Sequence, residues 1–143
     1  MRKTIILILF VIILAGLAVL GFRKFKPATV LAPVTTIQTG LVVNTPKPND
    51  LISSPLIITG FVNGDGWIGF EGQVGVVSLY DSAEKLLAVK PLVAVTDWMT
   101  STINFAVDLE FDATTGSGKL IFRNENPSGM PERDRQFVLP VKF

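Results

Sequence analysis

The stretch Ile103-Asn104-Phe105-Ala106-Val107-Asp108-Leu109-Glu110-Phe111 is the part of the sequence that indicates the fold most clearly. Large apolar residues occupy every second position, and smaller, polar or charged residues lie between them. Because side chains along a β-strand point alternately to opposite faces, this stretch predicts a strand with one buried and one solvated face. The buried face needs a second apolar layer to pack against, which favours a layered all-β fold.

The C-terminal end of the chain repeats this alternation. Phe137, Leu139, Val141 and Phe143 fall on one face of a second predicted strand. Pro140 lies between them and cannot donate a backbone hydrogen bond, so it indicates an edge strand or a bulge.

Between the N-terminal region and these strands, short apolar stretches alternate with Gly, Pro, Asn and Asp, as is typical of strands joined by turns. No segment after Phe22 shows helical periodicity over about ten residues. About seven strands therefore predict an antiparallel β-sandwich over residues 40–143. The other strands are expected at residues 41–44, 55–63, 70–80, 86–95 and 119–123. We expect the core to contain Leu56, Ile58, Val74, Val76, Phe105, Val107, Leu109, Leu120, Phe122, Leu139 and Val141.

Residues 5–22 form an 18-residue apolar run without a charge. As a helix it would be about 27 Å long, which approaches the hydrocarbon thickness of a bilayer. Arg2 and Lys3 form a short basic tail that normally stays in the cytoplasm. We therefore expect residues 1–26 to be a single-pass membrane anchor with basic flanks, followed by an extracytoplasmic domain.

A cleaved signal peptide is the alternative interpretation of the N-terminal region, because small residues follow its apolar part. Either outcome places residues 27–143 outside the cytoplasm. Residues 27–39 carry two prolines, no charge and no helical periodicity, so we interpret them as a tether.

The charges are distributed unevenly along the chain. Five of the 13 basic residues flank the apolar run, which leaves eight basic against twelve acidic residues for positions 27–143. A domain with a net charge of −4 repels a phosphate backbone, so we expect no nucleic-acid partner. The chain has no Cys and no His, and it therefore lacks the commonest general base, the thiol nucleophile and the commonest transition-metal ligands.

Several motifs resemble catalytic or ligand sites but have simpler interpretations. The segment Gly64–Gly69 has the glycine spacing of a dinucleotide-binding loop, yet a Gly- and Val-rich strand follows it instead of a helix. Gly116–Lys119 resembles the end of a phosphate-binding loop but lacks its upstream glycine and its hydroxyl. Both are interpreted as turns, and the aspartates near strand ends as turn residues instead of calcium ligands. We expect no cofactor, no metal and no catalysis.

Four residues are the candidate binding site: Trp67, Phe70, Glu71 and Trp98. The aromatic residues fall near strand ends, where exposed rings stack on sugars or anchor a protein partner. The alternative is that the two tryptophans fill the ends of the sandwich. Glu71 is the most conspicuous acid beside them, and its alternative role is to fix the start of its strand.

The order of several short motifs resembles the immunoglobulin-like domain associated with bacterial spore germination proteins. The resemblance covers about residues 40–143 and rests on motifs along the chain: Ser53-Ser54-Pro55-Leu56 before Gly60, Trp67, Phe70-Glu71-Gly72, Asp81-Ser82, Leu87-Ala88, Trp98 and the strand Phe105–Phe111. It implies an extracytoplasmic immunoglobulin-like sandwich used for adhesion, assembly or recognition, without catalytic residues.

These features together predict a membrane-anchored binding or adhesion module of the bacterial cell envelope. Its partner would be a cell-wall polymer or an envelope protein close to the membrane. The alternative is a structural spacer or assembly domain in an envelope complex. A carboxylate-based hydrolase of cell-wall glycans is a weaker alternative, because no acid pair stands out by its spacing.

Overall fold

The computed structural model describes residues 40–113 and 115–143. The expected anchor and tether lie outside these residues, and within them no helix is long and apolar enough to span a membrane. In the described residues, the regular structure consists of seven strands and one short 3-10 turn, Pro131–Arg133. The strands are β1 (Leu41–Thr45), β2 (Leu56–Val62), β3 (Gln73–Asp81), β4 (Leu86–Ala94), β5 (Ile103–Leu109), β6 (Ser117–Asn124) and β7 (Gln136–Lys142).

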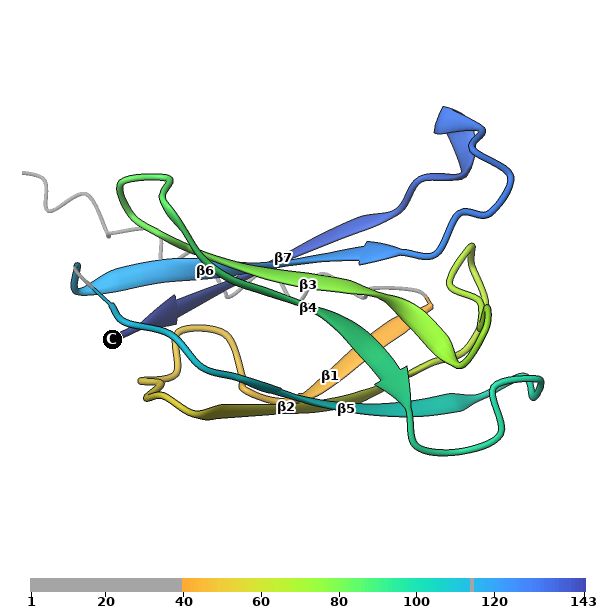
Figure 1. Ribbon diagram of the computed structural model, residues 1–143, viewed down its shortest axis with the longest axis horizontal. Helices are drawn as coiled ribbons and strands as arrows, with labels where there is room; N and C mark the ends of the chain where they lie inside the picture. Colours follow the sequence, from red (N-terminus) through yellow and green to blue (C-terminus); the bar gives the residue numbers. More distant parts are fainter. Residues whose placement is uncertain (1–39, 114) are drawn as a thin grey trace, which may run out of the picture. The chain divides into compact units, whose positions relative to one another are not determined.

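The strands form one curled antiparallel sheet in the order β1-β2-β5-β4-β3-β6-β7. Figure 1 shows how the curl produces two layers, with β1, β2 and β5 facing β3, β6 and β7. Strand β4 joins the layers, because it pairs extensively with β3 but meets β5 only at Val93 and Ala94. The all-β, antiparallel expectation is therefore confirmed.

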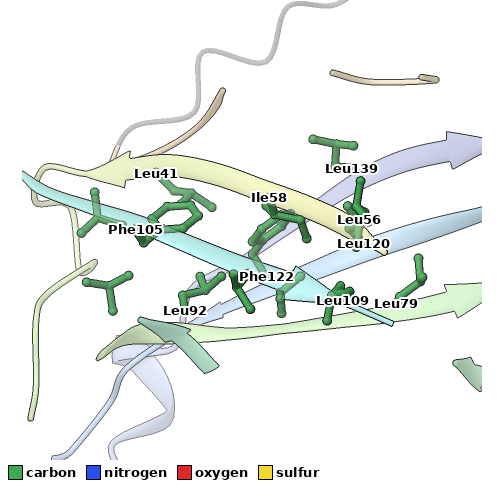
Figure 2. Packing of buried hydrophobic residues seen from close by; sticks show 14 of the residues in the cluster. Leu41, Leu56, Ile58, Leu79, Leu92, Phe105, Leu109, Leu120, Phe122 and Leu139 are labelled. Carbon is green, nitrogen blue, oxygen red and sulfur yellow. The ribbon is translucent and has the colours of Figure 1, made fainter. Parts of the chain in front are cut away.

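A single apolar core fills the space between the layers (Figure 2). Its largest fully buried side chains include Phe105 and Phe122, which come from opposite layers. Every expected core residue is buried except Val76, whose side chain is half-buried. Alternation along β5 and β7 thus identifies the inward faces correctly.

The error at Val76 has a local cause in β3. The pairing with β4 shifts register between Gln73 and Val76, and Gly75 lies there with a φ of +145°. A Cβ on Gly75 would lie 2.2 Å from the backbone oxygen of Arg123, so only glycine fits. This bulge inserts a residue and reverses the alternation, so that Val77 is buried instead of Val76.

Both edges of the sheet are partly protected. Strand β7 is an edge strand, as Pro140 indicates, and the backbone N–H of Asn49 donates to the Pro140 oxygen over 2.7 Å. The N–H of Ile52 donates to the Lys142 oxygen over 2.8 Å. At the other edge, Lys47 Nζ donates to the Val43 oxygen over 3.2 Å. Such capping limits pairing of the edges with other chains.

The two ends of the domain differ in what they carry. The first residue of the described chain, Gly40, lies beside the β2–β3 connection, since its oxygen accepts a hydrogen bond from Asn63 N–H over 2.9 Å. Figure 1 shows the β2–β3, β4–β5 and β6–β7 connections gathered at this end, and the C-terminus at the opposite one. We call the three connections, residues 63–72, 95–102 and 125–135, the loop end.

Candidate functional site

All four predicted site residues lie at the loop end, but they differ in exposure. Trp98 and Phe70 expose 38% and 41% of their surface, and Glu71 is also exposed. Trp67 exposes only 3% and belongs to the core. The fold therefore brings the four residues to one end without making them one solvent-facing cluster. Trp67 packs in the core beneath the exposed residues of the loop end.

The β2–β3 connection is a tight turn that positions Trp67. Gly64, Asp65 and Gly66 all have positive φ angles, and the Trp67 N–H donates to the Gly64 oxygen over 3.0 Å. The following chain enters strand β3, so the interpretation of the glycine pattern as a turn agrees with the structure. On its inner side the Trp67 ring contacts Gly40, where a Cβ would lie 2.7 Å from Cδ1.

The β4–β5 connection is ordered by its own polar side chains. Asp97 Oδ1 accepts a hydrogen bond from the Met99 N–H over 2.9 Å, as in an Asx turn. The Asn104 N–H donates to Thr96 Oγ1 over 3.0 Å. Thr100 Oγ1 lies 2.8 Å from the Asp97 oxygen and can donate to it. These bonds hold a loop whose apolar side chains face solvent, and the Met99 side chain is 78% exposed.

The two connections pack directly against each other at Gly69. A Cβ at this position would lie 2.3 Å from the Trp98 oxygen and 2.8 Å from Ile103 Cδ1. The absence of a side chain therefore lets the two backbones touch. The contact frames a concavity of about 440 Å³. Its lining is mostly apolar and comprises Asn63, Gly64, Trp67, Ile68, Gly69, Trp98, Met99, Thr100, Ser101 and Ile103.

Asn124 attaches the β6–β7 connection to the same end. Its Nδ2 donates to the Gly66 oxygen over 2.6 Å and to the Arg133 oxygen over 3.0 Å, while its Oδ1 accepts from the Arg135 N–H over 2.8 Å. A second concavity of about 300 Å³ lies here. It is lined by Gly66, Ile68, Asn124, Glu125, Asn126, Pro127, Ser128, Arg133 and Arg135.

Ile68 lines both concavities, so the two lie next to each other at the loop end. We call the two concavities together the Ile68 groove. Sequence reasoning identified Trp98 beside it but missed Met99, Arg133 and Arg135. The signal at Met99 was an exposed-looking apolar residue inside a run of Asp, Thr and Ser. The arginines gave no comparable signal, because isolated charges in a loop are ordinary surface residues.

A larger concavity of about 590 Å³ lies at the opposite end and has a different character. Its lining residues include Glu110 and Asp112 together with Lys85 and Phe111. In the described ranges, 40–113 and 115–143, no three or more His, Cys, Asp or Glu side chains group as a metal site.

Of the two ion pairs found within the described ranges, one joins β4 to β5 and the other joins β6 to the β3–β4 turn. Lys90 Nζ and Asp108 Oδ1 are 3.2 Å apart, and Lys119 Nζ and Glu84 Oε1 are 2.7 Å apart. The hydrogen bond from Lys90 is the main reason why the pKa of Asp108 lies below its usual range. Both pairs are solvent-exposed and so contribute little to binding or stability.

Comparison with protein families, with curated proteins and with solved structures finds no match for this chain.

Proposed function

We propose that this chain is a membrane-anchored binding or adhesion module of a bacterial cell envelope, and that the loop end of its extracytoplasmic domain is the binding surface. The observation that carries the proposal is the Ile68 groove. Its apolar side chains are held in solvent by ordered loops on a rigid sheet. Exposed apolar groups on a preorganised scaffold are typical of recognition sites.

The strand order supports an immunoglobulin-like interpretation of the sheet. With the seven strands lettered A to G in chain order, β1-β2-β5-β4 corresponds to the A-B-E-D sheet and β3-β6-β7 to the C-F-G sheet of that fold. The pairing of β3 with β4, which joins the two layers, departs from two separate sheets. Immunoglobulin-like domains commonly use loops at one end for binding, and we propose this use here.

The expected anchor limits where the partner lies. Residues 5–22 would hold the chain in the membrane, and the tether of residues 27–39 spans roughly 20 Å as a flexible coil. The tether joins the domain at Gly40, which is at the loop end. A partner reached by this surface, whether a cell-wall polymer or an envelope protein, therefore lies near the membrane.

The structural spacer is the second candidate function, because Trp67 is buried and acts as a core residue. The exposure of Trp98 and Met99 favours binding, since a spacer has no need of apolar side chains in solvent. A carboxylate-based hydrolase of cell-wall glycans remains the weakest alternative.

Retention by isolated envelope fractions tests the proposal. The full chain in mild detergent is applied to purified wall polymer and, separately, to membrane proteins, and wild type is compared with Trp98→Ala. Trp67→Ala is unsuitable, because removing a buried side chain destabilises the fold. Val138→Ala is the matched control, since Val138 is 44% exposed on β7, away from the groove. Retention lost only in Trp98→Ala supports binding, whereas no retention of wild type favours the spacer.

A further inference from the structure

We infer that the Ile68 groove binds an extended segment of a protein, in which an apolar side chain lies close to a carboxylate. The inference rests on the proposed binding function and names the partner class. The half of the groove that contains Trp98 and Met99 takes the apolar side chain. The half that contains Arg133 and Arg135 takes the carboxylate.

The contacts of Arg135 hold its guanidinium group in one position, where it can bind an anion. Its Nη1 donates to the backbone oxygens of Glu132 and Asp134, both over 2.9 Å, and its Nε would lie 3.0 Å from a Cβ on Gly66. The guanidinium is thus fixed against the β2–β3 turn. Neither Arg133 nor Arg135 makes an ion pair with any residue in the described ranges. Planar guanidinium groups with free N–H donors match a carboxylate well.

The charge of the surroundings favours a single carboxylate over a polyanion. Glu125 lines the same half of the groove. Asp134 lies next to this half, because its Oδ1 accepts a hydrogen bond over 2.7 Å from Nδ2 of the lining residue Asn126. The excess of acidic over basic residues in positions 27–143 would repel a highly charged wall polymer. Among the described residues that line this half, the two guanidinium groups carry the positive charge, and Arg123 lines a neighbouring concavity with Arg135.

The apolar half favours a protein over a glycan. Sugar rings stack on flat aromatic faces, and Trp98 is the only well-exposed ring that lines the described part of this groove. Ile68 and Met99, which are 46% and 78% exposed, are aliphatic and present no flat face. Protein interfaces are enriched in aromatic residues, Met and Arg, and their binding energy is concentrated in Trp, Tyr and Arg. The groove has this composition.

Synthetic peptides on the full chain in mild detergent test the inference. The probes are fluorescein-labelled Gly/Ser dodecamers that contain one Trp, with Glu placed one, two or three residues after it. Matched peptides carry Gln or Lys in place of Glu, or Ser in place of Trp. Because a hydrogen bond to a charged group is stronger than a neutral one, Glu-to-Gln replacement should weaken binding of the best peptide at least about tenfold. Fluorescence anisotropy measures the affinities.

Variants of the protein test which groove residues bind the carboxylate and the apolar side chain of the peptide. Arg135→Gln should reduce the preference for Glu over Gln peptides, while Lys142→Gln, the same charge change at the opposite end, should leave it intact. Trp98→Ala should weaken the Trp peptides without altering the Glu preference. Equal binding of Glu, Gln and Lys peptides would overturn the inference. So would binding of purified wall polymer with no peptide binding, an outcome that leaves the proposed function standing. Failure of the wall polymer, the membrane proteins and the peptides alike would contradict both the inference and the proposed function.

Discussion

Substitution of Gly69 by alanine tests whether the two loops at the groove are packed as described. The new Cβ would lie 2.3 Å from the Trp98 oxygen and 2.8 Å from Ile103 Cδ1, and real Cβ atoms do not approach backbone this closely. The β4–β5 connection must therefore move away, at the cost typical of overpacking, about 1–3 kcal/mol. The Trp98 ring moves with it, so the groove opens.

Equilibrium unfolding in urea, followed by far-UV circular dichroism on the full chain in mild detergent, measures the loss. With an m-value of about 2 kcal/mol/M, a loss of about 2 kcal/mol lowers the midpoint by about 1 M. Gly116→Ala is the matched control, because a Cβ there meets nothing within 4 Å and the φ angle is not positive. It should leave stability unchanged or raise it by up to about 1 kcal/mol. A Gly69→Ala midpoint within error of wild type would refute the described contact.

Three further outcomes follow from the strands and from the attachment of the β6–β7 connection by Asn124. Val77→Ala should lower the free energy of unfolding by about 2 kcal/mol because its side chain is fully buried, whereas Val76→Ala should cost less than about 1 kcal/mol; equal losses would place the bulge elsewhere. Asn124→Ala should cost about 1–2 kcal/mol and shift the amide NMR signals of the β6–β7 connection, and an unchanged spectrum would contradict its anchoring role. Carboxyl NMR should show the pKa of Asp108 below its usual range, and in Lys90→Met this pKa should return towards the usual range. Because the pKa is depressed in the folded state, any stabilisation from this pair is present above the usual pKa. That stabilisation is lost as the pH falls through the folded-state pKa.

Much of the fold could be predicted because the strands are half-buried. Alternation in β5 and β7 locates their inward faces, and turn residues bracket the other strands within a few positions. The exception is β3, where most side chains from Val74 to Asp81 are buried and alternation carries little information. Only the backbone angle of Gly75 determines which valine faces inward, and a glycine in a Val-rich run does not reveal it.

The candidate site was less predictable than the fold, for a different reason. Trp98 and Phe70 were placed correctly near strand ends. The sequence could not show that Trp67, unlike Trp98, is buried, because the turn at Gly64–Gly66 directs its ring inward against Gly40. The groove itself depends on contacts between segments that are distant in sequence. Arg135 reaches Gly66 across about seventy residues, and no local pattern encodes such a contact.

The measurement that tests the binding account most directly is site-specific photo-crosslinking in intact cells that produce the full chain. A photoreactive amino acid replaces Met99 in the groove or Leu51 in the β1–β2 connection, side chains that are 78% and 77% exposed. Equal exposure makes random collisions equally frequent at the two positions. The account predicts a discrete crosslinked product from position 99 and none from position 51. Absence of a product at position 99, or the same products from both positions, would contradict a binding surface at the loop end.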